Sequence, residues 1–245
     1  MWHRPRTLNT LADLLYLFSG GLLLAAVLIW LTRVPFSPVR EVLVPHPLVH
    51  VQASEIEDAL EGVLRGNFLT LNLDVARLEL EKLPWVRRAD VRRRWPSRLE
   101  VSLEEQTVAA RWGEGRGELV NSYGEVFVAN LPETEGRNLP LLYGPKGSSR
   151  DVFAFYQKAE QSLDPLGLTV QEVNLSLRLA WQFRLANGMM VYLGREETRS
   201  SVAQRLQRLV DVYPSGIARQ VPRPSAVDLR YPNGFAMRLA GVSLP

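Results

Sequence analysis

Residues that commonly bind metals or transfer protons are few in this chain and are poorly spaced for either task. Its 245 residues include three histidines and no cysteine, which excludes disulfides, thiol catalysis, iron–sulfur clusters and Cys-ligated zinc. His46 and His50 have the H-x-x-x-H spacing that binds a metal from a helix, but Pro45 and Pro47 are incompatible with a helix there. We therefore expect two surface histidines in a loop, with no metal site.

Motifs for covalent catalysis or phosphate binding are also missing from the sequence. Neither G-x-S-x-G nor S-x-x-K occurs, and residues 144–149 (GPKGSS) lack the spacing of a phosphate-binding loop. Glu104 and Glu105 are neighbours on a predicted strand, so their side chains face opposite ways and cannot act as a carboxylate pair. The sequence thus predicts a protein that is not an enzyme, with no cofactor and no small-molecule substrate.

One cluster of charge is dense enough to weigh as a binding surface. Six arginines fall within twelve residues: Arg87, Arg88, Arg92, Arg93, Arg94 and Arg98. Nucleic-acid binding would need aromatic rings free to stack, whereas Trp85 and Trp95 adjoin prolines and are predicted to pack against strand ends. The net charge of +3 falls to +1 outside residues 1–33, which also disfavours nucleic acid.

Three interpretations of this cluster remain, in order of preference. The first is a solvated edge strand that its charge protects from mispairing. The second is a docking face for another protein, made of Arg87, Arg88, Arg92 and Arg94. The third is a surface for anionic lipid.

Residues 14–31 form an uncharged, mostly apolar run of 18 residues, which is typical of a membrane-spanning helix. Counted from Leu11, with Asp13 near the edge, the segment has 21 residues, and as a helix it would span roughly 31 Å, enough for a bilayer core. Tyr16 and Trp30 lie near its ends, where amphipathic rings prefer to sit. A cleaved signal peptide would be shorter and end in small residues, and a buried core helix would not be apolar on all faces. We therefore predict an uncleaved anchor.

The charges that flank the run predict its orientation. Arg4, Arg6 and the terminal amine precede it, and Arg33 and Arg40 follow it, a bias of three positive charges against two. This bias places a short tail inside the cell and the rest of the chain outside, which in a bacterium means the periplasm or outer face.

The first segment after the anchor has the order strand, helix, helix, strand, strand. Residues 39–44 are β-rich, and Ser54 with Glu57 is predicted to form a capping box before an apolar 3.6-residue period. Asp74 is predicted to cap a second helix that ends at Pro84. Residues 86–94 and 99–104 read as two strands joined by a turn. Two helices on one face of a three-stranded sheet make a small α+β unit.

The following segment is β-rich. Helices are predicted near residues 148–163 and 198–212, and the pairs Asn187-Gly188 and Asn233-Gly234 indicate tight hairpins. Strands are predicted at residues 108–112, 119–121, 126–129, 170–175, 181–185, 189–193, 226–230 and 235–239. The fold class is therefore α+β: one transmembrane helix, a β-α-α-β-β unit, then a mostly antiparallel β domain with helices.

A set of short motifs in a fixed order resembles the FtsQ/DivIB family of bacterial cell-division proteins. The longest is LPWVRRADVRRRWP at residues 83–96, and the β-α-α-β-β unit around it looks like a POTRA domain. The others are LEV at 99–101, ARW at 110–112, NSYGEVF at 121–127, LPLLYGP at 139–145 and VDLRY at 227–231. Each motif alone is weak, but their order along the whole chain is specific.

This resemblance implies four parts: a short cytoplasmic tail (1–10), a transmembrane helix (11–32), a linker with the POTRA domain (33–106) and a β domain with partner-binding C-terminal strands (107–245). It implies a non-enzymatic, single-pass scaffold of the divisome in the inner membrane at the septum, with the C-terminal part in the periplasm. The implied partners are FtsB and FtsL, and through them the septal peptidoglycan synthase pair FtsW and FtsI. FtsK is suggested as an upstream partner of the POTRA domain.

The binding mode that we expect is addition of a partner strand to an open sheet edge on the hairpin that contains residues 226–231. By resemblance, Arg195 and Arg230 would pair with carboxylates of the partner, and Tyr231 would be an aromatic anchor. The family often has Trp eight residues after this Tyr, where this chain has Leu239, and Phe235 is a candidate substitute. The complete predicted set is Arg195, Val227, Leu229, Arg230, Tyr231, Phe235 and Leu239.

Two other classes of protein were weighed. A POTRA-bearing transport or outer-membrane assembly component usually carries several POTRA units before a β-barrel, and only one such unit is recognisable here. A tethered hydrolase would need a nucleophile and a base, and no such pair is recognisable.

Overall fold

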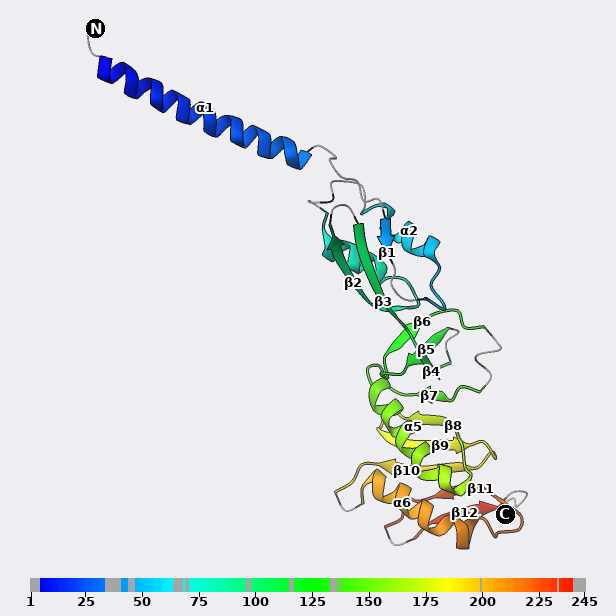
Figure 1. The fold of residues 1–245 in the computed structure, drawn as a ribbon. Helices are drawn as coiled ribbons and strands as arrows, with labels where there is room; N and C mark the ends of the chain where they lie inside the picture. The colour runs from blue at the N-terminus through cyan, green and yellow to red at the C-terminus, as the bar shows by residue number, and fades with distance from the viewer. Residues whose placement is uncertain are drawn as a thin grey trace. The chain divides into compact units, whose positions relative to one another are not determined.

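The computed structural model describes residues 5–33, 41–43, 47–63, 68, 71–95, 98–114, 117–132, 136, 138–198, 200–232 and 234–239. The chain forms two compact units, Met1–Glu105 and Gln106–Pro245 (Figure 1).

Helix α1 (Pro5–Arg33) is the predicted apolar helix. Its segment Asn9–Trp30 has 22 residues with a mean hydropathy of 2.1, and none of its most apolar stretch is buried against the rest of the protein. A helix of that length and composition is long enough to cross a bilayer.

The remainder of the first unit has the predicted order of elements. They are β1 (Glu41–Leu43), α2 (Ala53–Glu61), α3 (Leu73–Leu80), β2 (Val86–Arg94) and β3 (Arg98–Glu105). The sheet order is β1-β3-β2, with β1 parallel and β2 antiparallel to β3. Buried side chains from both helices and the sheet share one core: Ile56, Leu60, Ala76, Leu80, Val86, Ala89, Val91, Leu99 and Val101.

Both helices of this unit begin before the predicted caps. The N-caps are Gln52 and Asn72 rather than Ser54 and Asp74. The side chain of Asn72 accepts hydrogen bonds from the backbone N–H groups of Asp74 and Val75, at 3.0 and 3.3 Å. Burial explains the earlier starts, because the residues just before the caps belong to the same core as the fourth helical residues, the arrangement of a hydrophobic staple. These pairs are Val51 with Ile56 and Leu71 with Ala76.

The second unit is built on a nine-stranded sheet. In chain order the strands are β4 (Val108–Trp112), β5 (Glu118–Asn121), β6 (Val126–Val128), β7 (Leu141–Tyr143), β8 (Val170–Leu175), β9 (Ala180–Leu185), β10 (Met190–Arg195), β11 (Pro224–Asp228) and β12 (Ala236–Leu239). Their order in the sheet is β12-β11-β10-β9-β8-β7-β4-β5-β6. Five of the eight strand pairs are antiparallel and three are parallel.

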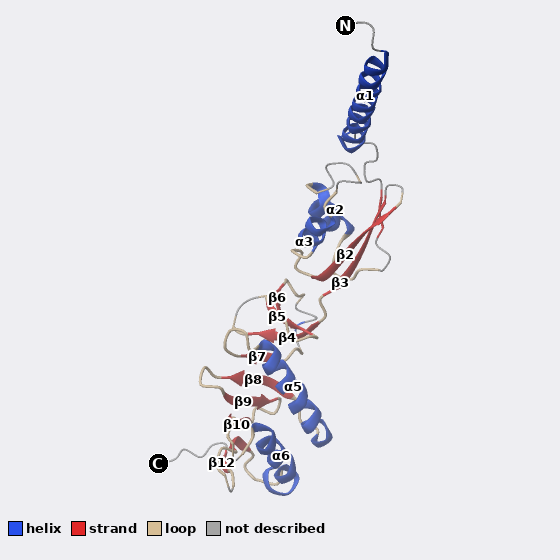
Figure 2. Ribbon diagram, turned by 90° about the vertical axis from the view of Figure 1, so that its left-hand side faces the viewer, coloured by secondary structure: helices blue, strands red, loops and turns tan. Residues whose placement is uncertain are grey.

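Two long helices, α5 (Ser149–Leu163) and α6 (Val202–Val212), cover one face of this sheet (Figure 2). Short turns follow each of them, η1 (Asp164–Leu166) and η2 (Tyr213–Ile217). The core between helices and sheet includes Val152, Leu163, Leu206, Leu209, Phe183, Val191 and Val227. Helix α6 starts four residues later than predicted, because Ser201 and Gln204 form a capping box: each side chain bonds the other's backbone N–H, at 3.1 and 2.9 Å.

Strand β7 was not predicted. It has only three residues, too few for a two-residue alternation to be recognised, and it pairs in parallel with both β4 and β8. Its central residue, Leu142, is fully buried. Parallel pairing joins segments that are distant in the sequence, which a local pattern cannot report.

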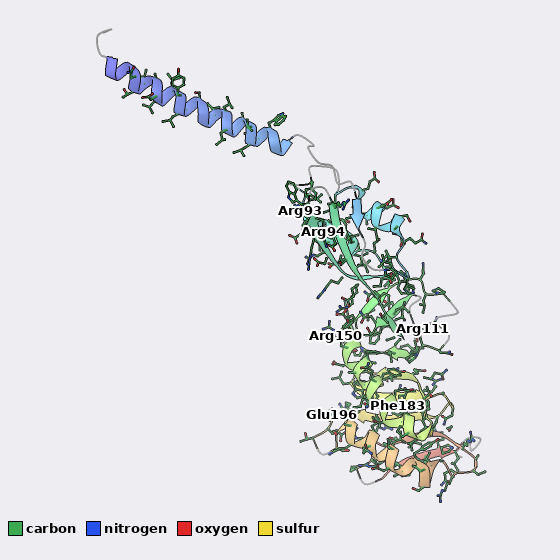
Figure 3. All side chains as sticks on the ribbon, viewed as in Figure 1. Arg93, Arg94, Arg111, Arg150, Phe183 and Glu196 are labelled. Carbon is green, nitrogen blue, oxygen red and sulfur yellow. The ribbon has the colours of Figure 1, made fainter. Side chains whose placement is uncertain are left out.

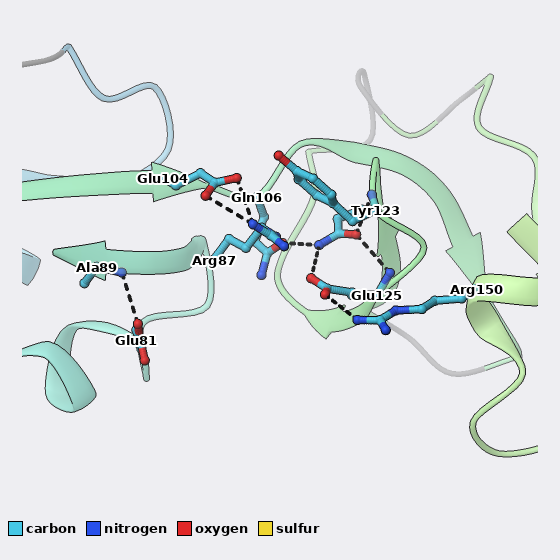
Figure 4. Close-up of polar contacts among 9 residues, drawn as sticks. Glu81, Arg87, Ala89, Glu104, Gln106, Tyr123, Glu125 and Arg150 are labelled. Atoms are coloured by element: carbon cyan, nitrogen blue, oxygen red, sulfur yellow. Dashed lines mark hydrogen bonds and ion pairs between the residues drawn. The ribbon is translucent and has the colours of Figure 1, made fainter. Parts of the chain in front are cut away.

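The turn between β5 and β6 depends on one buried amide side chain. Asn121 is fully buried, and its carbonyl oxygen accepts from the backbone N–H groups of Tyr123 and Glu125, each at 2.9 Å. Its amide nitrogen donates to Gln106 at 2.8 Å, and Arg150 pairs with Glu125 at 2.7 Å (Figure 4). This network gives the NSYGEVF segment a structural role.

Candidate functional site

The open edge of the large sheet near the C-terminus is strand β12. Strand β11 pairs with β10 on one side and with β12 on the other, whereas β12 pairs only with β11 among the described residues. The strand within residues 226–231 is therefore paired on both sides, and the open edge of its hairpin is the second strand, β12. The antiparallel return of the chain after residue 232 places the open edge one strand further on.

Strand alternation identifies which backbone groups of β12 point outward. The N–H of Leu229 donates to the carbonyl of Tyr192 on β10 at 2.9 Å, and the Ser225 hydroxyl donates to the carbonyl of Arg238 at 3.0 Å. The backbone groups of Arg238 thus face β11. Because successive residues of a strand present their N–H and C=O to opposite sides, those of Met237 and Leu239 point away from the sheet.

An ion pair fixes the end of β11 beside this edge. The guanidinium of Arg230 contacts both carboxylate oxygens of Asp228, at 2.8 and 2.5 Å, and the Arg230 backbone N–H donates to the same carboxylate at 3.0 Å. These hydrogen bonds lower the pKa of Asp228, although its partial burial acts in the opposite direction, and they raise the pKa of Arg230. The sequence predicted a carboxylate of the partner for Arg230, whereas the structure supplies one from the same chain.

Arg230 also lies against β10. Its guanidinium carbon is 5.9 Å from the centre of the Tyr192 ring, a cation–π distance. Gly194 has a φ of +77°, and a Cβ there would come within 2.9 Å of the Arg230 side chain. A glycine is needed at this position both for its backbone conformation and for the room it leaves.

A groove of about 560 Å³ lies between these groups and the edge strand. On β11 its lining residues Ala226 and Asp228 alternate with the buried Val227, so there the groove lies on the face of the sheet opposite helix α6; on β12 it also includes Met237. The residues that line it are Tyr192, Ala226, Asp228, Arg230, Tyr231, Ala236, Met237, Arg238 and Leu239. It therefore combines apolar walls with the Asp228–Arg230 pair, a further arginine and two tyrosine rings.

The predicted partner-binding residues fall into three groups. Arg195, Arg230 and Tyr231 are exposed, and Tyr231 keeps 53% of its surface accessible. Phe235 and Leu239 are half-buried; Phe235 packs against the main core and Leu239 lines the groove.

Val227 and Leu229 form the third group and correct the prediction. Both are fully buried in the main core, so neither side chain is available to a partner. The side chain of Val227 lies on the buried face of β11. Leu229 is two residues further along, so its side chain lies on the same face, in the core beneath α6.

Two further arginines that the sequence did not single out hold this region together. Arg205 is 1% exposed and donates to the carbonyls of Leu193, Arg195 and Ser200, the last two at 2.8 and 2.5 Å. Arg208 donates to the carbonyl of Tyr231 at 2.9 Å. The sequence did contain a signal for Arg205, because it lies three residues after Val202, on the apolar face of the predicted helix.

In the first unit, every arginine of the cluster except Arg98 lies on an edge strand, since β2 is outermost in its sheet among the described residues, whereas Arg98 begins the central strand β3. Arg87 is only 17% exposed and pairs with Glu104 at 3.0 Å (Figure 4). Arg93 donates to the backbone carbonyls of Phe68 and Leu71. Of the predicted docking face, Arg88, Arg92 and Arg94 are exposed.

Near the arginine cluster, Glu105 has a structural role, and Trp85 and Trp95 differ in how they pack. Glu105 accepts hydrogen bonds from the backbone N–H groups of residues 49, 50 and 51, each at 2.9 Å. Burial raises the pKa of Glu105, but these three donors outweigh it and lower that pKa overall. Trp85 stacks on His50 at 4.0 Å, whereas Trp95 is 83% exposed and does not pack as predicted.

Metal binding finds no support in the part of the chain that the structure describes, where no three His, Asp or Glu side chains form a group that could hold an ion. His46 lies outside the described residues.

Comparison with known families gives two adjoining matches. Residues 37–106 match the POTRA domain of the FtsQ type, and residues 110–230 match the C-terminal region of the cell division protein FtsQ/DivIB. Together they cover the first unit beyond the apolar helix and most of the second unit, up to residue 230.

Curated relatives extend the similarity over nearly the whole chain. The chain is 42% identical to the cell division protein FtsQ of Burkholderia pseudomallei, over 99% of this chain and 96% of that protein. It is 38% identical to that of Nitrosospira multiformis (97% of this chain, 99% of the relative) and 30% identical to that of Neisseria gonorrhoeae (100% and 98%).

Proposed function

This chain belongs to the FtsQ/DivIB family of cell division proteins, and from that premise we propose that it is a non-enzymatic scaffold of the bacterial divisome. Its single apolar helix, Asn9–Trp30, fits a single-pass membrane protein. In the proposal the N-terminus is cytoplasmic and the two folded units are periplasmic, at the division septum. Family membership decides against the transport and outer-membrane assembly alternative.

The proposed partners are FtsB and FtsL, with FtsW and FtsI engaged through them. The observation that carries this proposal is an edge strand, β12, with its outer side unpaired among the described residues and a groove along it. An extended segment of the partner would pair with the outward N–H and C=O groups of Met237 and Leu239, which supplies affinity without depending on side-chain identity.

Specificity would come from the groove. Side chains of an added strand alternate between the two faces, so one set would lie toward Tyr231 and the Asp228–Arg230 pair. Tyr231 is large, rigid and 53% exposed, properties of residues that dominate binding energy at interfaces. Because Arg230 is already paired with Asp228, we assign it to shaping the groove rather than to capturing a partner carboxylate alone. Arg195, which is exposed at the end of β10, remains the proposed contact for an acidic partner residue.

The POTRA unit is proposed as a recruitment module whose upstream partner is FtsK. The exposed arginines of β2, namely Arg88, Arg92 and Arg94, are the surface available for it. A fluorescent chain that lacks residues 40–105 should fail to reach the division site, and normal septal localisation of that chain would contradict this role.

A proline scan of the sheet edges tests strand addition. Met237→Pro removes an outward N–H from β12 without removing a hydrogen bond to β11, since proline has no N–H to donate. We expect the full-length chain in nanodiscs to bind an FtsB peptide at least about tenfold more weakly, as measured by fluorescence anisotropy, with unchanged thermal unfolding. Tyr231→Ala should weaken binding by a similar amount.

The matched control is Val128→Pro on β6, the strand at the other edge of the same sheet. The N–H of Asn121 on β5 donates to the carbonyl of Glu125, and the N–H of Ala129, just after β6, donates to the carbonyl of Gly117. Because backbone groups alternate along a strand, the N–H of Val128 points away from the sheet. This variant should bind the peptide as tightly as the unmodified chain. If Met237→Pro and Val128→Pro bind equally well, the proposed edge is wrong.

A further inference from the structure

A tryptophan stands exposed at the turn of the β2–β3 hairpin in the first unit. Trp95 is 83% exposed, although tryptophan is usually largely buried. Residues 91–100, on either side of it, contain four arginines and one glutamate. Figure 3 labels Arg93 and Arg94 on this hairpin. An exposed indole ring flanked by arginines is unusual for a surface that contacts only water.

The strand register places this turn at a particular end of the sheet. Strand β1 runs parallel to β3, with Glu41 opposite Arg98. The first residue of β1 therefore lies beside the first residue of β3, at the end where the hairpin turns. The chain reaches that same end of the sheet directly from the apolar helix.

Chain length then limits how far the turn can be from the membrane. Eight residue steps separate Arg33, the last residue of α1, from Glu41. Fully extended, they span at most about 28 Å. If α1 crosses the bilayer, Glu41 is tethered within that reach of Arg33, and the hairpin turn lies at the same end of the sheet as Glu41, so the bilayer is a permanent neighbour at high effective concentration.

The arginines around Trp95 divide into structural and available ones. Arg93 binds two backbone carbonyls within its own unit. Arg92 and Arg94 are 74% and 64% exposed and make surface ion pairs with Asp90 and Glu100, at 2.7 and 2.8 Å. Surface pairs of this kind contribute little in water, so their guanidinium groups can exchange carboxylates for lipid phosphates at low cost.

We infer that Trp95, with Arg92 and Arg94, forms a lipid-facing tip that binds anionic phospholipid headgroups of the membrane that holds α1. Tryptophan prefers the headgroup level of a bilayer, and arginine adds electrostatic attraction to anionic lipid while its aliphatic stem lies along the acyl boundary. The inference rests on the proposed membrane placement of the chain but not on strand addition at β12. It gives the third interpretation of the arginine cluster a specific geometry.

The absence of native cysteine allows a direct test with one spin label. The full-length Ser97→Cys chain, labelled beside Trp95, is reconstituted in nanodiscs of mixed phosphatidylglycerol and phosphatidylcholine or of phosphatidylcholine alone. A polar paramagnetic reagent reports exposure of the label to water. We expect protection in the anionic discs, reduced by about fivefold for each arginine that is neutralised to glutamine, equivalent to about 1 kcal/mol.

Matched variants separate this tip from general effects. Trp95→Ser and the pair Arg92→Glu/Arg94→Glu should abolish protection, while Arg195→Glu in the other unit should leave it intact. A label at Leu177→Cys, which is 88% exposed in the second unit, should stay accessible in both lipids. Tyr231→Ala should lose peptide binding yet keep the protection, which distinguishes failure of this inference from failure of the proposed function.

Two results would overturn the inference. One is equal accessibility of the Ser97→Cys label in anionic and neutral discs. The other is accessibility that changes only when a purified division protein is added, which would assign the tip to a protein partner.

Discussion

Individual side chains in this protein mostly maintain backbone geometry rather than perform chemistry. Arg93, Arg205 and Arg208 donate to backbone carbonyls, and Asn121 and Glu105 accept from backbone N–H groups. Such bonds satisfy polar groups at turns and strand ends that the regular ladders leave unpaired. The proposed scaffold, which would offer a backbone edge to a partner, depends on this kind of positioning.

Glu105 gives a prediction at this scale. Because its pKa is lowered in the folded protein, its ionised form stabilises the fold above the unfolded pKa, near the ordinary value of 4.5, and this contribution is lost as the pH falls through the lower, folded value. For a partly exposed carboxylate we expect Glu105→Gln to cost about 1 kcal/mol at neutral pH. Amide exchange at residues 49–51 should speed up about fivefold.

The same measurement contains its own checks. Glu57→Gln, an exposed substitution on α2, should not alter exchange at these amides. The difference between Glu105→Gln and the unmodified chain should shrink as the pH falls below 4.5 and through the lowered, folded pKa of Glu105, because the carboxyl group is then neutral like the amide. Equal exchange at neutral pH, or a difference that does not depend on pH, would contradict the assigned role.

At the scale of elements, helix α6 and strand β10 depend on one buried cation. Arg205 on α6 bridges the carbonyls that end β10 and those that precede the helix. Glu197 lies 3.7 Å away as its ion-pair partner. The segment that carries Gly194 and Arg195 is therefore held by a helix side chain in addition to its pairing with Trp181 and Ala180 of β9.

Removing this cation should damage the second unit. Arg205→Met keeps much of the volume but leaves buried carbonyls without donors, and we expect a loss of about 3 kcal/mol or more in the free energy of unfolding. Arg219→Met, at an exposed position, is the control and should be neutral. Thermal unfolding followed by near-UV circular dichroism would measure both, and an unchanged transition for Arg205→Met would show that the network is dispensable.

At the scale of the whole molecule, the chain joins a membrane-length apolar helix to two units that each have their own core. No described residue of the apolar helix belongs to either hydrophobic core. This separation suits a tethered protein, because the helix fixes the location while the folded units remain free to bind partners.

The placement of the units relative to the membrane can be tested with single cysteines. Leu177→Cys should react with a membrane-impermeant maleimide in spheroplasts, and Thr7→Cys should react only after the membrane is permeabilised, because three positive charges precede the span and two follow it. Both should react equally in detergent. Labelling of Thr7→Cys in sealed spheroplasts, without labelling of Leu177→Cys, would invert the proposed topology.

Local patterns in the sequence were sufficient for much of this protein. An apolar run long enough for a bilayer, the apolar 3.6-residue period that follows Ser54 and the Asn187-Gly188 turn each depend on residues that are close in the chain. The order of elements in the first unit and the α5 helix followed from such patterns. The ordered motifs also identified the family, which the comparisons confirm.

Tertiary structure alone decided the details of the binding edge. Val227 and Leu229 are buried because β11 is an interior strand beneath α6, and β12 is the open strand because the chain turns back on the outside of β11. Strand β7 and the role of Arg205 likewise depend on segments that meet only after folding. Hydrophobic periodicity determines which face of a strand is buried, but the order of strands in a sheet is set by pairing between distant segments, and that order determines which backbone groups remain available to another chain.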